Sequence, residues 1–478
     1  MGTQFFALGT IFVPIFGSLT IPIAALVSSK FRNFWAALIG ISTFILPLFL
    51  MRDILQNPAG EFVFRYPFIF NLDFILLIDG LSVFASLVSS FIGALIILYS
   101  IDYVAHDDYQ SEYYLMVVMF IGSMMGLVYS GSLVFMYIFW EISAICSWRL
   151  IGFYRYPLHI VKADKSFLIT FFGAVVMLFG FIQIHSYTHT FDMTAMRTVP
   201  VSSLAVFLIL IGMFSKSATF PLHTWLPDAG VAPSTVTSLL HAAVLVKIGV
   251  YAYARLFCYT FNIPFEWDSI IPVLVMFSSL VSAGAALIEY DIKRILALST
   301  VSQIGYIFLG FWTRTIIGVT GATLFILMHG LAKAGLFLCA GIIEHGTGKR
   351  DIRELGGLFK SMPFTAISFL ACILSVIGIP PFGGFFSKFM VISGTVEAGR
   401  PGIAFMGLFI AVMTAVYLFR LFHSVFSGEN KTQGHEGSSM MVGIVFVLAF
   451  LSLIAGIFIG FSGFFAEMSA DHLLERIR

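Results

Sequence analysis

The chain has 478 residues, of which 59% are hydrophobic and only 11% are charged. A soluble domain carries about 25% charged residues, so this composition excludes an ordinary globular protein and indicates an integral membrane protein. The net charge of +1 gives no basic field for nucleic acid, which excludes a nucleic-acid-binding function.

Hydropathy windows of about 19 residues predict about 14 transmembrane helices, with no cleavable signal peptide before the first. The predicted spans lie near residues 5–29, 33–51, 76–99, 113–130, 132–152, 166–186, 202–226, 233–257, 270–289, 292–313, 316–343, 363–391, 402–426 and 440–466. Between the second and third spans, residues 53–75 contain Pro58 and then apolar side chains at Phe62, Phe64 and Tyr66. This alternation predicts a short hairpin outside the membrane.

Two of the predicted spans combine a deep lysine with a helix-breaking proline. Lys216 precedes Pro221 in the seventh span, and Lys388 follows Pro380 and Pro381 in the twelfth. The interrupted spans are five helices apart, so the second unit is inverted relative to the first, a pattern typical of transport sites.

The predicted fold is therefore an all-α integral membrane protein with two inverted five-helix repeats, spans 4–8 and 9–13, each with one broken helix. The N-terminal helices and the hairpin occupy 1–112, and the first repeat occupies 113–258. The second repeat occupies 259–427, and 428–478 holds a polar loop, the last span and a short tail.

Lysines and arginines outside the deep positions predict the orientation of the chain. Most of them lie in loops after odd-numbered spans, whereas fewer lie in the even-numbered loops and in the tail with Arg476 and Arg478. The positive-inside rule then places the odd loops in the cytoplasm and both termini on the outer face of an inner, prokaryotic cytoplasmic membrane.

The four cysteines, Cys146, Cys258, Cys339 and Cys372, are scattered singly through apolar segments. Without a CxxC pair or a Cys/His cluster, the sequence predicts no disulfide, zinc or iron–sulfur site, and no glycine-rich nucleotide fingerprint follows a strand. We therefore expect no metal, cofactor or catalytic residue in this chain. If its function is redox-linked, the electrons travel in another subunit.

Glu141 and Lys216 are the first two ionisable groups at bilayer depth. Such a group costs at least about 2.5–3.5 kcal/mol, so it persists where it faces a partner or a wet cavity. Glu141 is either a neutral acid that bonds a neighbouring helix or a carboxylate that pairs with Lys216. Lys216 lies too deep to reach the interface easily, which favours a proton carrier over a snorkelling side chain.

The remaining deep ionisable groups are two histidines and three lysines. His241 and Lys247 are six residues apart on one span and face different directions. His241 is equally well read as a relay or as a helix–helix hydrogen bond. His329 and Lys333 are four apart on one face and predict a relay between the broken helices, with Lys388 as the terminal group.

Asp79, at the start of the third span, is as well suited to capping that helix as to conducting ions. Glu344, His345 and Lys349 fall at the end of the eleventh span. We expect them to be solvated on the cytoplasmic side.

These residues, in this order, resemble the antiporter-like membrane subunits of respiratory complex I, of group 4 membrane-bound hydrogenases and formate hydrogenlyases, and of Mrp-type cation/proton antiporters. The matching stretches are 137–141 (YIFWE), 216–218 (KSA), 221–229 (PLHTWLPDA), 232–234 (APS), 240–247 (LHAAVLVK), 329–333 (HGLAK), 378–381 (GIPP) and 385–388 (FFSK).

The resemblance implies that Glu141 and Lys216 form the key ion pair of the family. It also implies connecting relays at His241 and Lys247, a central lysine at Lys333 and an exit-side group at Lys388. The expected function is a proton- or sodium-translocating subunit of a redox-driven membrane complex, with iron–sulfur, flavin or nickel–iron centres in its partner subunits. The alternative is a subunit of an Mrp-type antiporter without redox chemistry.

Within the family, the short tail after the last span fits an inner antiporter-like subunit, or its hydrogenase-type counterpart, better than the distal subunit of complex I. A structural membrane subunit is the remaining alternative, which four deep lysines disfavour.

The same residues predict a hydrated axis near the middle of the bilayer. Each group lies deep in its own span, so neighbours must serve each other directly or through water. Consecutive groups should then lie within roughly 10 Å, the reach of one or two bridging waters. The two breaks should open wet half-channels to opposite faces of the membrane.

Overall fold

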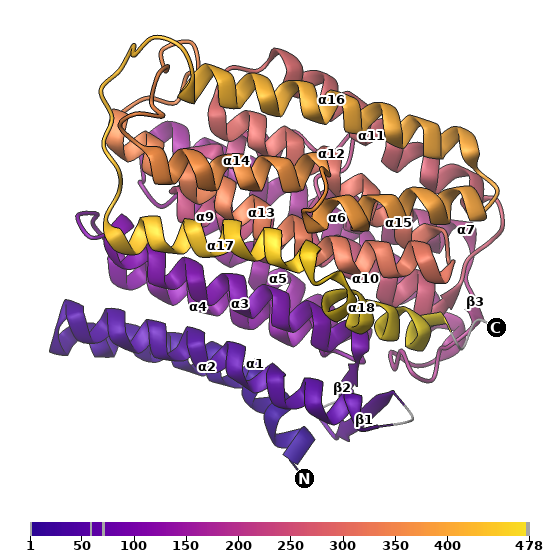
Figure 1. The fold of residues 1–478 in the computed structure, drawn as a ribbon. Helices are drawn as coiled ribbons and strands as arrows, with labels where there is room; N and C mark the ends of the chain where they lie inside the picture. Colours follow the sequence, from indigo (N-terminus) through magenta and orange to yellow (C-terminus); the bar gives the residue numbers. More distant parts are fainter. Residues whose placement is uncertain (1, 58–59, 69–71, 475–478) are drawn as a thin grey trace.

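The computed structural model describes residues 2–57, 60–68 and 72–474, and helices make up most of it (Figure 1). Its α-helices are α1 (Gly2–Val27), α2 (Ser29–Leu55), α3 (Gly80–Tyr103), α4 (Gln110–Val128), α5 (Leu133–Ile151), α6 (Pro157–Thr188), α7 (Ser203–Lys216), α8 (Trp225–Asp228), α9 (Ser234–Ser238), α10 (Leu245–Tyr253), α11 (Trp267–Ile288), α12 (Ile292–Trp312), α13 (Ile316–Thr347), α14 (Pro363–Ile377), α15 (Gly383–Glu397), α16 (Pro401–Phe426), α17 (Ser439–Ile457) and α18 (Ile459–Leu474).

Twelve helical segments in the described part of the chain are long and apolar enough to cross a membrane. Two further apolar helices, α7 and α14, are shorter. They begin the two spans that the sequence predicts to be broken. The predicted class, a multi-pass helical membrane protein, is confirmed, while the count of fourteen spans and the division into inverted repeats stay predictions.

Two spans depart from a simple helix in ways that hydropathy does not reveal. The predicted span at 233–257 contains α9 and α10 joined by a π-helical segment, Leu239–Ala243, and continues into a second π-helical segment, Ala254–Thr260. The predicted span at 440–466 is divided into α17 and α18, and Figure 1 shows the second of these turning away from the first. The apolar composition continues across both changes, so a hydropathy window reads each as one helix.

The predicted hairpin is present, and it extends further than expected. Strands β1 (Glu61–Tyr66) and β2 (Phe74–Asp79) pair antiparallel, with Glu61 opposite Asp79. All six residues of β2 are buried, which places this strand against the helices. Pro58, part of the predicted hairpin, lies outside the described residues.

Both ends of the described chain meet this hairpin. The Gln4 side chain donates a hydrogen bond to the Tyr66 hydroxyl at 2.5 Å, and Gly80, directly after β2, packs against Ser469 of α18. The two ends therefore lie on the same face of the molecule, which we call the hairpin face. Arg476 and Arg478 lie outside the described residues.

The loops of the opposite face carry most of the ion pairs between helices. Asp228 pairs there with Lys162, Lys165 and Arg294, at 2.8 Å in each case. We call this the lysine-rich face, defined by residues 149–165, 289–294 and 344–360. Figure 1 shows the hairpin and the C-terminus at one end of the helix stack and the loop before α17 at the other.

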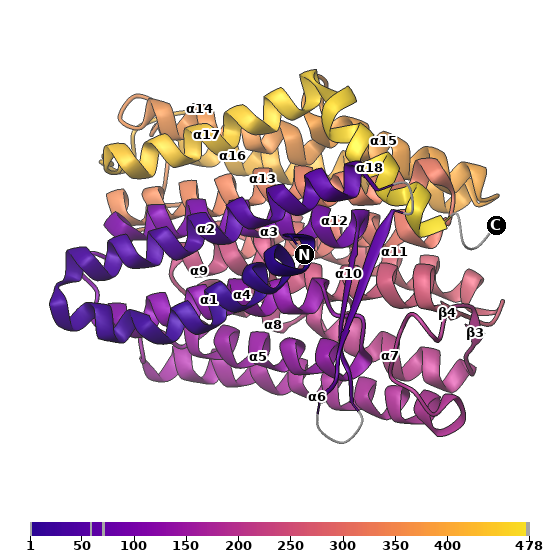
Figure 2. The ribbon, with the colours of Figure 1, turned by 90° about the horizontal axis from the view of Figure 1, so that it is seen from below.

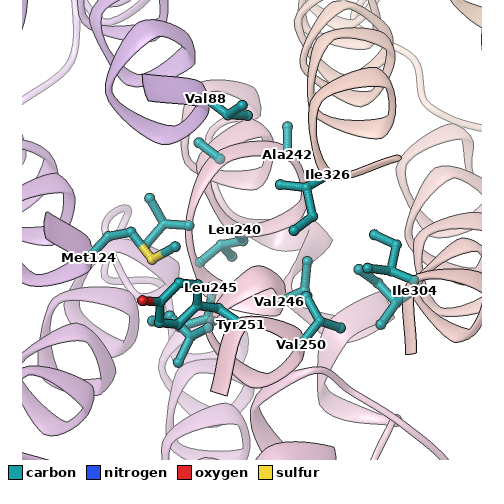
Figure 3. Close-up of a cluster of buried hydrophobic side chains, with 14 of the residues drawn as sticks. Val88, Met124, Leu240, Ala242, Leu245, Val246, Val250, Tyr251, Ile304 and Ile326 are labelled. Atoms are coloured by element: carbon teal, nitrogen blue, oxygen red, sulfur yellow. The ribbon is translucent and has the colours of Figure 1, made fainter. Parts of the chain in front are cut away.

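Helix α13 lies at the centre of the molecule. It packs against α3, α9, α12, α14, α15, α17 and α18. Figure 3 shows the apolar core beside it, where residues from α3, α4, α10, α12 and α13 meet. Helices α1 and α2 lie at one edge of the helix stack in Figure 1, and Figure 2, seen from below, shows them in front of the other helices. They expose many large apolar side chains. Lys247 on α10 and His329 and Lys333 on α13 are thus enclosed by protein.

Candidate functional site

Lys216 is the last residue of α7, and the chain leaves helical geometry directly after it. Its side chain is fully buried, and its Nζ donates a hydrogen bond to the Trp140 carbonyl at 3.1 Å. The break that follows, which contains Pro221, is held by the Trp225 indole, whose Nε1 donates to the freed Ser215 carbonyl at 2.9 Å. The Phe220 amide in the break donates to Ser278 Oγ at 2.9 Å, so two backbone groups at the break have side-chain partners, as a membrane protein requires. Phe220 and Pro221 themselves lie at the surface of this chain.

Glu141 lies one residue after the carbonyl that Lys216 binds. One of its carboxylate oxygens, Oε1, is buried without a hydrogen-bond partner among the described residues. Glu141 and Lys216 interact electrostatically, but the described chain shows no direct ion pair between them. The two groups that the resemblance pairs are therefore neighbours, with Lys216 bonded to the backbone of α5 rather than to the carboxylate.

His241 lies within the π-helical segment Leu239–Ala243, and Lys247 lies on α10 directly after it. The Val244 amide donates to the Leu239 carbonyl, five residues back, which widens the helix. Lys247 Nζ donates to the Ala242 carbonyl, and the His241 ring stacks on Phe337 of α13 with centres 4.3 Å apart. Neither ring nitrogen of His241 has a partner among the described residues, so the helix–helix hydrogen bond is not observed.

His329 and Lys333 lie on α13, both fully enclosed. Lys333 Nζ donates to the Leu296 carbonyl of α12 at 3.0 Å. His329 has no hydrogen bond from either ring nitrogen within the described ranges. Its electrostatic neighbours are Lys247, Lys333, His241 and Lys388. The structure thus gathers the central predicted groups around α13.

Lys388 lies on α15, just after the second break. Its Nζ donates to the carbonyls of Val376 and Ile377, at 2.7 and 3.2 Å, which end α14. It also lies 5.1 Å from the centre of the Tyr306 ring. The ammonium therefore bridges the break that contains Pro380 and Pro381, and it faces the negative end of the α14 dipole.

Asp79 has the capping role that the sequence allowed. Its Oδ1 accepts a hydrogen bond from the Ser82 amide at 2.9 Å at the start of α3. Its two oxygens also bind the fully buried Arg255, at 2.6 and 2.8 Å. The sequence did not single out Arg255, because this residue lies near the end of its predicted span, 233–257, where an arginine looks like a residue of the following loop.

Glu344 is not simply solvated, which corrects the sequence-based expectation. It forms an ion pair of 2.6 Å with Lys293, whose side chain is only 2% exposed, while that of Glu344 is 26% exposed. His345, the next residue, stacks on Tyr103 with ring centres 4.1 Å apart. Lys293 is the second residue of its predicted span, 292–313, so only the contact with α13 reveals that it is buried.

The described part of the chain contains no group of three or more His, Cys, Asp or Glu side chains arranged to hold a metal ion. All four cysteines are buried and unpaired.

Two family models match this chain. The model described as NADH:quinone oxidoreductase/Mrp antiporter, TM, matches residues 130–414, and the model for the N-terminus of complex I chain 5 matches residues 68–114. The chain is also 31% identical to the Na(+)/H(+) antiporter subunit A1 of Staphylococcus aureus, over 94% of this chain and 61% of that protein. It therefore spans about three-fifths of the length of these curated relatives.

Three solved structures share the fold. The membrane-bound sulfane sulfur reductase, an archaeal respiratory membrane complex, gives a TM-score of 0.90 at 22% identity, with 98% of each chain covered. The Mrp complex from Dietzia sp. DQ12-45-1b gives 0.87 at 20% identity, again with 98% of each chain covered. Respiratory complex I from Thermus thermophilus gives 0.85 at 22% identity, covering 99% of this chain and 100% of that one.

Proposed function

Because the chain belongs to the NADH:quinone oxidoreductase/Mrp antiporter family of membrane subunits, we propose that it translocates protons or sodium ions within a multi-subunit membrane complex. The proposed pathway consists of Glu141, Lys216, His241, Lys247, His329, Lys333 and Lys388. Lys216 exchanges a proton with Glu141 and passes it towards the relays on α10 and α13. Lys388 is the exit-side group.

One observation carries this proposal: four buried lysines bind backbone carbonyls, and none has an ion pair with a carboxylate among the described residues. A buried ammonium that only holds helices together would normally be neutralised by a carboxylate, since an unpaired buried charge is costly. A lysine that gains and loses a proton needs no permanent counter-ion. The arrangement therefore favours transport over a purely structural role.

We propose that the parent complex is redox-driven, because moving one charge against 100 mV costs about 2.3 kcal/mol and needs an exergonic partner reaction. The fold similarity to two respiratory complexes supports this assignment. The 31% identity to a Na(+)/H(+) antiporter subunit favours the alternative, an Mrp-type complex without redox chemistry. Affinity purification under mild detergent distinguishes them: co-purified subunits with iron–sulfur, flavin or nickel–iron centres support the first, and small membrane subunits alone support the second.

We further propose an orientation for the chain and a location for the redox centres. The lysine-rich face lies in the cytoplasm, and both termini lie on the outer side of a prokaryotic inner membrane. Redox centres belong to partner subunits, and this chain holds none. Metal and flavin analysis of the separated subunit tests whether this chain holds a redox centre. Stoichiometric iron, nickel or flavin in it would contradict the proposal.

Reconstitution of the complex in vesicles tests the transport role. Lys333→Met keeps the side-chain volume but removes the proton-exchanging group, so we expect ion flux to fall by about 100-fold or more, the scale of a lost acid–base group. Lys349→Met, at the lysine-rich face beyond the end of α13, is the matched control and should keep its flux. Flux unchanged by Lys333→Met in a fully assembled complex would refute the pathway.

A further inference from the structure

The lysine-rich face contains a hollow of about 580 Å³ beside the end of α16, which we call the α16 hollow. Residues from the loops after α11, α13 and α16 line it, together with side chains from the last two turns of α16. The basic residues in this lining are Arg353, Arg420, His423 and Lys431, and the acidic one is Glu429. The hollow therefore has an excess of positive over negative charge, which favours an anionic ligand.

Two of these cations, Arg420 and Lys431, have no ion pair with a carboxylate among the described residues, whereas Arg353 pairs with Asp351 at 2.6 Å. Arg420 donates to two carbonyls at the end of α11, but its Nε is buried without a hydrogen-bond partner in the described chain. Lys431 donates to the Arg353 carbonyl at 3.4 Å, which is a long hydrogen bond. Because an unpaired buried donor costs about 1–3 kcal/mol, an anionic oxygen in the hollow would be favourable.

The Tyr290 ring brings two guanidinium groups together in the hollow. The central guanidinium carbons of Arg353 and Arg420 lie 4.3 and 5.6 Å from the centre of this ring. Stacking on an aromatic ring restricts an arginine side chain, so less of its freedom is lost when it binds a ligand. The planar fork of an arginine matches the geometry of a phosphate, to which it can donate two parallel hydrogen bonds. The hollow is therefore suited to a phosphate group.

An apolar stripe on α16 leads from the membrane to the hollow. The stripe consists of four exposed residues, each three or four positions from the next, Phe409, Val412, Val416 and Phe419. His423 lies four positions further along the same face, and it lines the hollow. Figure 1 shows α16 at the edge of the helix stack, opposite α1 and α2. A molecule with an anionic head and apolar chains would therefore contact the hollow and the stripe together.

We propose that the α16 hollow binds the phosphate of an anionic phospholipid, whose acyl chains lie along the apolar stripe of α16. Basic pockets between membrane helices are typical sites for anionic lipid headgroups. The phosphate oxygens accept hydrogen bonds from Arg420 and Lys431, the two cations without a carboxylate partner. A zwitterionic phospholipid binds less well, because its own ammonium group is repelled by the same cations. This binding does not depend on the proposed transport function.

Acetylation of the native lysines tests this proposal in the intact complex. The complex is placed in nanodiscs of phosphatidylglycerol, which is anionic, or of phosphatidylcholine, which is zwitterionic. Residue-resolved mass spectrometry then follows the rate at which an acetylating reagent modifies Lys431. Lys360 is exposed on the same face but does not line the hollow, so it is the matched reference. An anionic membrane surface affects both lysines, and the ratio of their rates therefore isolates the effect of the hollow.

We expect phosphatidylglycerol to lower the ratio of the Lys431 rate to the Lys360 rate at least about threefold relative to phosphatidylcholine, because bound lipid occupies the hollow. Arg420→Gln removes a phosphate donor and should abolish this difference. His423→Gln should reduce the difference too, and it leaves the hydrogen bonds between Arg420 and α11 in place.

Three results would overturn the proposal. The first is an equal ratio in the two lipids, whether Lys431 reacts quickly or slowly. The second is a lipid effect that persists unchanged in both variants. The third is equal protection of Lys431 by inorganic phosphate added to phosphatidylcholine nanodiscs, which would identify the ligand as a soluble anion rather than a lipid.

Discussion

In the first interrupted helix the lysine precedes the break, and in the second it follows the break. Lys216 reaches across to the backbone of α5, next to Glu141, so its hydrogen bond does not hold its own break together. Lys388 reaches back to the last carbonyls of α14, so its hydrogen bond spans the break itself. The first lysine can change partner without loosening its helix, which suits a mobile carrier, whereas the second suits a gate that couples protonation to the geometry of the break.

The two breaks also differ in how their second halves are anchored. Helix α8 ends at Asp228, which binds three cations from α6 and α12 at the lysine-rich face. Helix α15 begins at Gly383 and has no ion pair among the described residues. It packs instead against the end of α14, where a Cβ at Gly384 would lie 1.8 Å from the Ser375 carbonyl. Ion pairs therefore anchor α8, the second half of the first broken span, and close backbone packing anchors α15, the second half of the other.

The largest expected effect is that of Lys216→Met on transport. If Lys216 is the mobile carrier, its loss should abolish ion translocation, a fall of about 100-fold or more, while the complex stays assembled because methionine keeps the volume. Vesicle flux assays on purified complex measure this. Near wild-type flux in an assembled complex would remove Lys216 from the pathway.

Next in size is Gly384→Ala at the second break. The new methyl group meets a backbone carbonyl that cannot rotate away, so we expect overpacking to cost about 1–3 kcal/mol and to lower the yield of folded protein. Gly230→Ala is the matched control beside α8, where a Cβ would make only ordinary contacts, at 3.5 Å, with Arg350 and Lys293. Thermal unfolding in detergent compares them. Equal midpoints would contradict the packing account of the second break.

Glu141→Gln should behave like Lys216→Met, because it removes the group that exchanges a proton with the first lysine. Glu141→Asp keeps the carboxylate on a shorter side chain, so we expect it to retain part of the flux. Glutamine is nearly isosteric with glutamate, so the comparison of Glu141→Gln with the wild type reports on protonation rather than on packing. Full activity of Glu141→Gln would show that Lys216 works without a carboxylate, as Lys388 does.

The smallest effect concerns Asp228, outside the apolar spans. Partial burial opposes its ionisation, but hydrogen bonds from Lys162, Lys165 and Arg294 lower its pKa to about 2, against an ordinary value of 3.8. A lowered carboxylate pKa stabilises the fold above the ordinary value, and this contribution is lost as the pH falls through about 2. Asp228→Asn should thus lower stability at neutral pH by on the order of 1 kcal/mol, after a discount for the exposed cations.

Unfolding midpoints of the detergent-solubilised protein between pH 7 and pH 2 check this prediction. The difference between wild type and Asp228→Asn should shrink below pH 4 and vanish near pH 2. Asp351→Asn, whose partner Arg353 is 64% exposed, is the control and should change little. A difference that persists unchanged at pH 2 would show that packing, not charge, anchors α8.

The sequence predicted the breaks through their prolines and the site through its deep lysines, because proline and buried charge leave local signals. It could not predict that Lys216 binds the Trp140 carbonyl or that Lys293 is buried against Glu344, since both contacts join segments distant in the chain. The π-helical segment at 239–243 also left no signal, because its composition matches the helix around it. The sequence does not show which helices pack against each other, and this packing decides which side chains face each other.

The hydrogen bonds of the four lysines share one property that concerns how the chain is made. Each lysine binds a carbonyl that is synthesised before it: Lys216 binds Trp140, Lys247 binds Ala242, Lys333 binds Leu296 and Lys388 binds Val376 and Ile377. A lysine at the centre of a span costs about 2.5–3.5 kcal/mol during insertion by the translocon. Each lysine leaves the ribosome after its acceptor, so nascent helices can shelter the charge as they enter the bilayer rather than after the whole chain is complete.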